Sequence, residues 1–334
     1  MIHWGQRAGK ALSTKETCDM DTARVGLARA GARRANVYQA LDLVREDVEP
    51  KLAAQVMLKP NFLSSENPLA STHADAMRGA IDFLLSTPQP PEEIVIAEGG
   101  NEKYSGEAFA NFGYDALVEE YSVPIRLVDL HQETRWEETT IHMAGGVEAT
   151  VRMPSVVLEC PCTISVAVAK THDVCVVTLA QKNMIMGTLH KEDRIKMHGY
   201  PSHAERVLPS EAEVLNVNLI RLAQYLKPDI GIVDGTVGLQ GNGPGGTDAV
   251  SMRAAAASAD VFAVDAVMAK AMGFEPMELG LLHYADTLGY GVADLERIEV
   301  RGVPIAEVSY VFKPHETTAQ QMQWRSAAVE QFLP

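Results

Sequence analysis

The stretch TISVAVAKTHD at residues 163–173 places a short apolar run directly before a lysine, a threonine, a histidine and an aspartate. A bounded apolar run rich in β-branched residues is typical of a strand buried on both faces of a sheet. In an open α/β sheet, ligands bind at the carboxyl ends of the strands. The polar residues from Lys170 to Asp173 are therefore expected to face a binding site.

The same pattern, in which a predicted strand runs straight into a polar turn, occurs at three other places: 55–61 (QVMLKPN), 93–101 (EIVIAEGGN) and 229–234 (DIGIVD). Helical patterns separate these strands, and this alternation predicts an α/β fold with a largely parallel sheet. Each cluster alone is equally well explained as an ordinary turn, since Pro, Asn, Gly and Asp are turn residues. Four such clusters together favour one shared site.

The length of 334 residues predicts two Rossmann-like lobes. The sequence AGG at residues 144–146, between two β-type segments, predicts a hairpin near 139–151 that separates them. The expected division is listed from the N-terminus: a first α/β lobe at 20–135, a hairpin connector at 136–155, a second α/β lobe at 156–310 and a peripheral tail at 311–334.

The composition excludes several classes of protein. With 46% hydrophobic and 22% charged residues, the chain is an ordinary globular protein. Its formal charge of -15 argues against binding to nucleic acid or to anionic membranes. The chain has no apolar stretch of ~20 residues and no signal-peptide pattern. Its 4 cysteines are too few for a disulfide scaffold. We therefore expect a cytoplasmic protein.

Residues 170–203 form the one basic stretch of this acidic chain, and they include four of its 10 histidines. If residues 189–198 are helical, then His190, Arg194 and His198 lie four apart and share one face. Such a face can bind a divalent metal ion. The candidate metal ligands are His172, His190, His198, Asp234 and Glu98. Two alternatives remain open: an anion clamp with cationic histidines, and a solvated helix face.

Lys182 lies between two apolar segments, 175–180 and 184–186, which predicts that its side chain is partly buried. Burial lowers the pKa of a lysine and can make it a base or a Schiff-base nucleophile. The alternative is a lysine that extends along a helix edge into water.

Several familiar sites are not supported. The glycine-rich loop at 241–246 matches neither Walker A nor GxGxxG, so no nucleotide motif is identified. Cys160, Cys162 and Cys175 are one short of a four-cysteine set, so no iron–sulfur cluster is expected in this chain. There is no GxSxG elbow.

The chain resembles family 362 of the domains of unknown function. The matching motifs, from 57 to 273, are MLKPNF, VIAEGG, AKTHD, LAQKNMIMG, KMHG, IVDGTVGLQGNGP and VFAVDAVMAKAMG. The family name implies no activity. Many relatives look like redox-associated proteins with an added ferredoxin-type iron–sulfur domain, and this sequence has no such cysteine-rich segment. The segment with strand-end His and Lys is also loosely similar to nickel-dependent lactate racemase.

The preferred hypothesis is an enzyme that acts on a small anionic metabolite, a carboxylate or a phosphate, in a cleft between the lobes. Isomerase, racemase or lyase chemistry would fit, with a divalent metal ion as an optional cofactor. The candidate catalytic residues are His172, Lys182, His190 and His198, and the candidate substrate-binding residues are Lys59, Asn61, Lys170, Asn183, Arg194 and Asn242.

The rival hypotheses are a non-catalytic carrier of a metal or cofactor, and a redox module that works with an iron–sulfur partner. The apolar helices expected at 260–272 and 277–288 belong either to the core or to the interface of a homo-oligomer.

Overall fold

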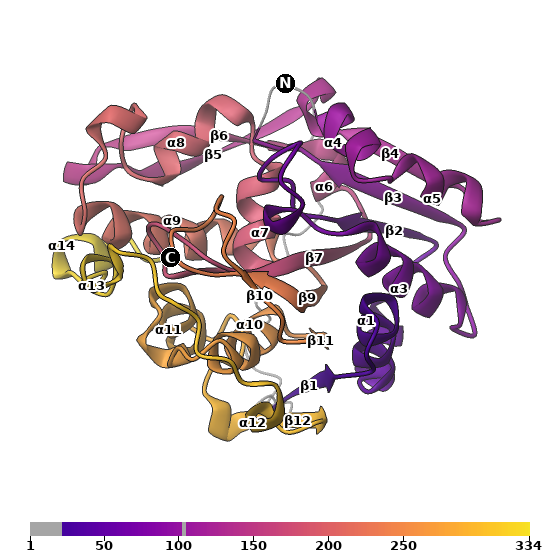
Figure 1. Ribbon diagram of the computed structural model, residues 1–334. Helices are drawn as coiled ribbons and strands as arrows, with labels where there is room; N and C mark the ends of the chain where they lie inside the picture. Colours follow the sequence, from indigo (N-terminus) through magenta and orange to yellow (C-terminus); the bar gives the residue numbers. More distant parts are fainter. Residues whose placement is uncertain (1–21, 102–104) are drawn as a thin grey trace.

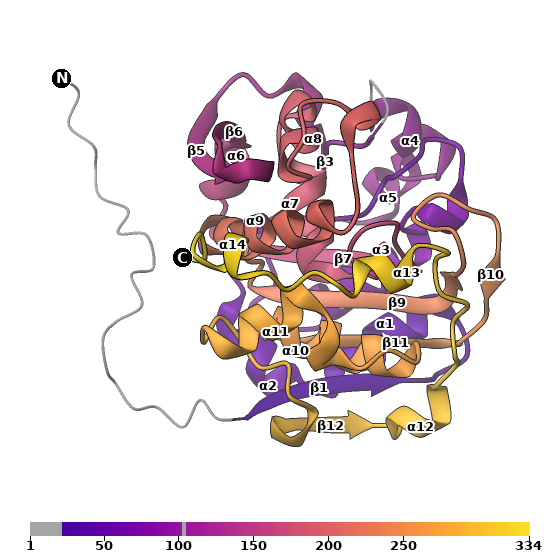
Figure 2. The ribbon, with the colours of Figure 1, turned by 90° about the vertical axis from the view of Figure 1, so that its left-hand side faces the viewer.

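The computed structural model describes residues 22–101 and 105–334. Its centre is one mixed sheet, and Figure 2 shows part of it from β12 at the bottom to β7. From one edge to the other its strands are β12 (Ile298–Gly302), β1 (Ala23–Ala28), β11 (Ala254–Ser258), β9 (Ile230–Leu239), β7 (Cys162–Thr171), β2 (Gln55–Lys59), β3 (Glu93–Glu98) and β4 (Ile125–Asp129). The short strands β8 (Val177–Thr178) and β10 (Ala249–Val250) pair with β7 and β9.

The five strands from β9 to β4 are parallel to one another, whereas β11 is antiparallel to both of its neighbours. The predicted α/β class with a largely parallel sheet is confirmed. The strands expected in two lobes nevertheless pair in one continuous sheet. Met57 of β2 pairs with Thr163 of β7, which joins the two halves of the chain.

Helices cover both faces of the sheet (Figure 1). One face carries α1 (Arg33–Asp42), α3 (Ala74–Leu85), α4 (Ser105–Asn111) and α5 (Asp115–Glu120); the other carries α7 (Ala180–Thr188), α9 (Ser210–Leu226), α10 (Val261–Ala271) and α11 (Gly280–Thr287). Alternate residues of each buried strand enter the two cores: Val56 and Leu58 pack on the α3 side, and Met57 on the α7 side.

The remaining helices are short. They are α2 (Arg45–Val48), α6 (Ser155–Leu158), α8 (Arg194–Met197), α12 (Ile305–Val308), α13 (Thr318–Gln321) and α14 (Ala327–Glu330), with single 3-10 turns that include η3 (Leu130–Gln132), η5 (Lys191–Asp193) and η6 (His203–Glu205). Among the described residues, no helix has both the length and the apolar character that a bilayer crossing needs.

Local chemistry explains three positions, one in the sheet and two at the ends of helix α10. At Gly26 of β1, an added Cβ would lie 2.0 Å from the carbonyl oxygen of Ala40, so only glycine lets α1 pack this closely. Asp260 caps α10 by accepting hydrogen bonds from the backbone N–H groups of Phe262 and Ala263, at 2.9 and 3.3 Å. Gly273, with φ of 92°, ends that helix.

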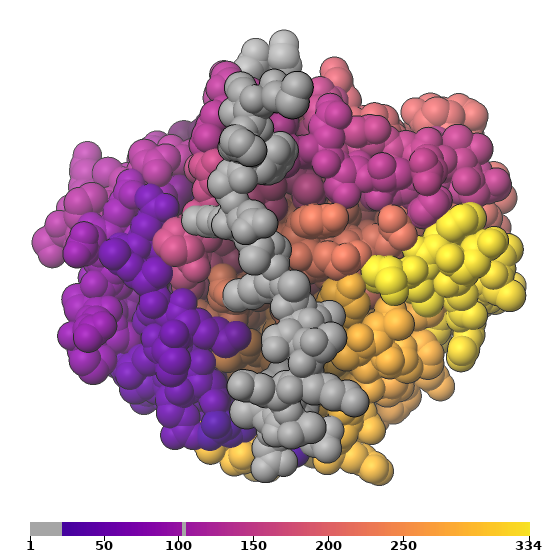
Figure 3. Space-filling view, turned by 180° about the vertical axis from the view of Figure 1, so that it is seen from behind, coloured from indigo at the N-terminus to yellow at the C-terminus, as the bar shows by residue number. Residues whose placement is uncertain are grey.

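The predicted hairpin is confirmed. It consists of β5 (Trp136–His142) and β6 (Glu148–Pro154), which form a separate two-stranded sheet. The C-terminal segment is packed more closely than the expected peripheral tail, since Phe312 and Trp324 are buried. The ring of Phe332 stacks on His142 of β5 at 4.1 Å. In Figure 3 the yellow C-terminal segment lies between orange atoms below it and magenta atoms above it.

Candidate functional site

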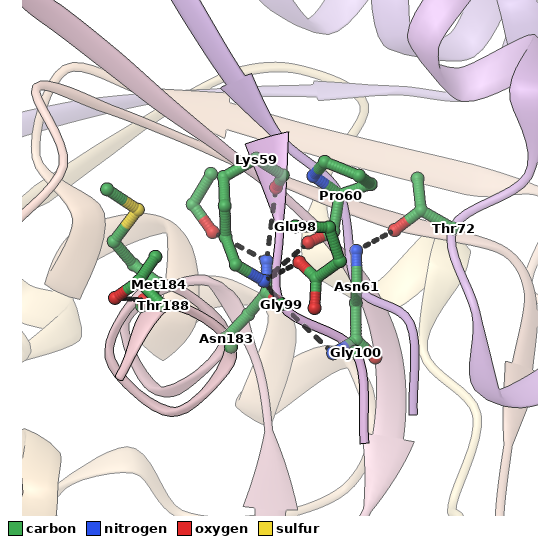
Figure 4. A network of polar contacts seen from close by, with 12 residues as sticks. Lys59, Pro60, Asn61, Thr72, Glu98, Gly99, Gly100, Asn183, Met184 and Thr188 are labelled. Atoms are coloured by element: carbon green, nitrogen blue, oxygen red, sulfur yellow. Dashed lines mark hydrogen bonds and ion pairs between the residues drawn. The ribbon is translucent and has the colours of Figure 1, made fainter. Parts of the chain in front are cut away.

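A buried polar network lies where β2 and β3 end (Figure 4). Lys59 is the last residue of β2, and its fully buried ammonium forms an ion pair with Glu98, the last residue of β3. The same ammonium donates to Asn183 Oδ1 at 2.8 Å and to the carbonyl oxygen of Pro60 at 2.6 Å. The network therefore ties two strands to helix α7.

The network continues to the end of β7. Asn61 Nδ2 donates to Asn183 Oδ1 at 3.0 Å, and Lys170 donates to Asn61 Oδ1 and to the carbonyl oxygen of Ala70, the latter at 2.8 Å. The structure thus brings together Lys59, Asn61, Lys170 and Asn183, all of which were predicted to bind substrate. Their polar groups are already used by one another inside the protein.

Burial controls the charges of this network. It lowers the pKa of Lys59 to about 8, against the attraction of Glu98. It also raises the pKa of Glu98, which Lys59 opposes. The pKa of Lys170 falls well below its usual range because of burial and the nearby charges of Lys182 and Lys59. Burial therefore disfavours the charged form of the Lys170 amine, which donates to amide and carbonyl oxygens.

Arg194 does not clamp an anion as predicted. Its guanidinium donates to the carbonyl oxygens of Leu189 at 3.0 Å and of Gly100 at 3.1 Å, and also to that of Gly99. Burial lowers its pKa to about 10. This side chain fastens the loop after β3 to the end of α7.

The expected helix at 189–198 is wrong, and this separates the histidines. Helix α7 ends at Thr188, and Leu189 and His190 both have extended ψ angles, 149° and 132°, before η5 and α8 begin. His190 and His198 therefore do not share a helix face. The ring of His190 packs edge-on against Trp136, with 4.9 Å between ring centroids.

The five predicted metal ligands do not gather at one point. Asp234 lies inside β9, and its carboxylate pairs with Arg33 of α1 at 2.6 Å. Glu98 pairs with Lys59, and His198 contacts Glu211. Within residues 22–101 and 105–334, no three His, Cys, Asp or Glu side chains are grouped so as to hold a metal ion. These residues do not fit the predicted metal centre.

Asn242 is also apart from the network. It is exposed in the glycine-rich loop, and its Oδ1 accepts a hydrogen bond from the backbone N–H of Glu316 at 3.1 Å. It connects this loop to the C-terminal segment.

A second cluster surrounds Lys182, in the first turn of α7. The cluster contains two imidazoles, those of His172 and His198. The positive charges of Lys182 and of protonated His198 both lower the pKa of His172. In the described part of the chain, the structure records no hydrogen bond or ion pair for the Lys182 ammonium, although the residue is only 7% exposed. This ammonium is the unmatched cation of the cluster.

The two imidazoles are held in opposite tautomers. His198 Nδ1 lies 2.6 Å from Glu211 Oε1, so Nδ1 carries the proton and Nε2 keeps a lone pair. His172 Nδ1 accepts a hydrogen bond from the backbone N–H of Val174 at 3.0 Å, so its proton belongs on Nε2. The described residues provide no recorded hydrogen bond to either Nε2 atom.

Burial lowers the pKa of both histidines. For His172 the shift is large, and the nearby cations add to it. For His198 the effect of burial outweighs the opposing effect of the hydrogen bond that its Nδ1 donates to Glu211. Both shifts favour the neutral form of these imidazoles, whereas the anion-clamp alternative needs the cationic form.

Arg206 links the carboxylates behind the two histidines. It pairs with Asp173 at 2.9 Å and with Glu211. Asp173 Oδ1 lies 3.1 Å from His172 Nδ1, but no hydrogen bond joins these two atoms in the described residues, since that nitrogen accepts from the N–H of Val174. The result is a chain of charged groups from the β7–β8 loop to α9, which holds the His198 ring through Glu211.

Sequence reasoning missed Glu211 and Asp265. Asp265 accepts hydrogen bonds from the backbone N–H groups of Ala180 and Gln181, at 2.7 and 3.0 Å, and so holds the start of α7. Burial raises its pKa to about 7. One signal was present: an aspartate within an otherwise apolar helix is rarely buried without a specific role. Glu211 carries no comparable signal, because a glutamate near a helix N-terminus is common.

Comparison with known proteins finds a family, a curated protein and solved structures to which the chain is similar. The profile of a family described as "Domain of unknown function (DUF362)" matches residues 56–270, more than half of the chain. The thylakoid-associated protein sll1697 of Synechocystis is 22% identical over 253 residues, which cover 70% of this chain and 68% of that protein. The lactate racemase apoprotein of Thermoanaerobacterium thermosaccharolyticum superimposes with a TM-score of 0.40 and 14% identity; the match covers 64% of this chain and half of that one.

Proposed function

Since the chain belongs to the DUF362 family, whose name assigns no activity, we propose from the site itself that it is an enzyme that moves a proton on a small carboxylate. The observation that carries this proposal is the pair of neutral imidazoles in opposite tautomers beside the unmatched cation Lys182. Each of the three groups suits a different part of one reaction.

Lys182 would hold the substrate carboxylate, because it is a nearly buried ammonium without an acidic partner among the described residues. His198 would act as the general base. Its Nε2 lone pair is free, Glu211 stabilises the imidazolium that forms, and its lowered pKa keeps it unprotonated at neutral pH. The proton leaves the carbon next to the carboxylate and arrives on His198 Nε2.

His172 would stabilise the enolate-like charge that develops as the proton leaves. A neutral imidazole whose Nε2 carries a proton can donate a hydrogen bond to an oxygen without giving up that proton. Return of the proton to either face of the carbon, or loss of a leaving group, would give isomerase or lyase products. The buried Lys59–Glu98 network would hold Lys182 in place, because Lys59 donates a hydrogen bond to Asn183, the residue after Lys182.

The cavity beside Lys182 is small, about 20 Å³, and Cys175, Leu279 and Leu282 line it. It has room for one water molecule. Neither His172 nor His198 is among its lining residues, so binding of a substrate to all three proposed groups would require these side chains, or the start of α11, to move.

Exchange in D₂O tests the proposal directly. The protein is incubated with small 2-hydroxy, 2-oxo and 2-amino acids, and loss of the Cα–H signal is followed by proton NMR. We expect exchange of at least one compound, and a half-saturation concentration raised about tenfold in Lys182→Met, because one charged hydrogen bond is lost. Lys51→Met, at an exposed lysine, is the matched control.

Two results would count against this assignment. The first is that no compound in the panel exchanges. The second is that Lys182→Met and Lys51→Met give the same half-saturation concentration.

A further inference from the structure

A second cavity lies at the other end of α7, beside η3 and the β5–β6 hairpin, with a volume of about 260 Å³. Lys182 is in the first turn of α7, whereas this cavity adjoins Leu189 just after its last residue. At 1.5 Å per residue the two sites are roughly 10 Å apart along the helix. The cavity is therefore separate from the proposed proton-transfer site.

The inner wall of this cavity is apolar. Leu130 and Leu189 are buried there, and the indole of Trp136 forms one side. The His190 ring meets that indole edge-to-face, at an interplanar angle of 77°. Such a wall favours a planar ring, which can contact the indole over a large area.

The charged lining residue of this cavity whose side chain has no recorded hydrogen bond or ion pair among the described residues is a cation, Lys191. Of its charged lining residues, Arg194 is engaged by backbone carbonyl oxygens, and Glu192 pairs with Arg152 at 3.1 Å. Lys191 is exposed, and among the described residues it has no recorded hydrogen bond or ion pair. One cation is left to attract a ligand with a single negative charge.

Hydrogen-bonding capacity is also unused. His190 Nδ1 is buried and has no hydrogen-bond partner within the described residues; its nearest recorded charged group is Glu192, whose Oε2 lies 3.9 Å away. His131 Nε2 lies 2.9 Å from the carbonyl oxygen of Gly100, so that nitrogen donates and Nδ1 keeps a lone pair. Buried polar atoms without partners are uncommon in folded proteins, so His190 Nδ1 is a candidate contact for a ligand.

We propose that this cavity binds a small aromatic monocarboxylate, with its ring on Trp136 and its carboxylate on Lys191 and His190. Such a ligand would use the indole of Trp136, the free cation of Lys191 and the unpaired nitrogen of His190 together. This site is independent of the proton-transfer reaction proposed above.

Benzoate is the probe, and quenching of indole fluorescence in the full-length protein is the readout, with calorimetry as a second measurement. We expect benzoate to quench the wild type and Lys191→Met to bind it about tenfold more weakly, since a charged hydrogen bond is removed. Lys51→Met should bind as the wild type does. In Trp136→Phe the fluorescence change should disappear.

Neutral benzamide has the same shape and should bind far more weakly than benzoate. Equal binding of benzoate and benzamide, or unaltered affinity in Lys191→Met, would overturn the proposal. Loss of benzoate binding in Lys182→Met but not in Lys191→Met would also overturn it, by placing the probe in the other site.

Discussion

Replacement of Glu98 by leucine should lower the free energy of unfolding by about 3–5 kcal/mol, because it leaves the buried Lys59 ammonium without its counter-charge. Both partners are almost completely buried, and the remaining contacts of Lys59 are neutral oxygens. The measurement is urea unfolding at pH 7, followed by circular dichroism. The effect is large because water cannot replace the lost carboxylate.

Two variants serve as controls for this result. The double variant Lys59→Met/Glu98→Leu removes both charges and should recover much of the lost stability. Glu159→Ala breaks the exposed pair of Glu159 with Arg135 and should cost less than about 1 kcal/mol. A double variant as unstable as Glu98→Leu would show that the unpaired ammonium is not the cause.

The second large effect concerns the proposed base. In His198→Asn the amide can still donate to Glu211, but the Nε2 lone pair is gone, so the D₂O exchange rate should fall about 10²–10⁴-fold. The fold should be retained, because the buried hydrogen bond to Glu211 is kept. The exchange rate at saturating substrate and the melting temperature are measured together.

The other imidazole should respond differently. In His172→Gln the amide still donates from the position of Nε2, so the exchange rate should stay within about tenfold of the wild type. His203→Asn, at an exposed histidine of the same segment, should leave the rate unchanged. Equal losses in His198→Asn and His172→Gln would refute the separate roles of base and hydrogen-bond donor.

Strand-end reasoning located the buried network well. Lys59 and Glu98 follow short apolar runs, and parallel strands bring such ends to one edge. The same reasoning failed at Asp234, where β9 continues to Leu239 because Asp234 pairs in the sheet with Ala255 and its side chain binds Arg33. An Asp-Gly pair in a strand and one in a turn look alike in a single sequence.

Other features depend on contacts that one sequence does not reveal. Apolar periodicity predicts that residues form a strand, but it does not predict which strand lies beside them. The sequence therefore predicts two lobes, whereas the strands form one continuous sheet. The spacing of His190, Arg194 and His198 suggested a helix face, whereas the long-range bonds of Arg194 to Gly99 and Gly100 favour a break after α7. The spacing of these three residues cannot predict hydrogen bonds to residues far away in the sequence.

The central claim is that His172 and His198 are neutral and in opposite tautomers, and ¹⁵N NMR of imidazole-labelled protein between pH 5 and 8 tests it most directly. The pKa of each group lies below its ordinary value, so the unfolded chain binds more protons below about pH 6.5 and stability falls as the pH drops through that range. At pH 7 we expect the proton on Nδ1 of His198 and on Nε2 of His172. An imidazolium at either position at pH 7, or the same tautomer at both, would contradict this account.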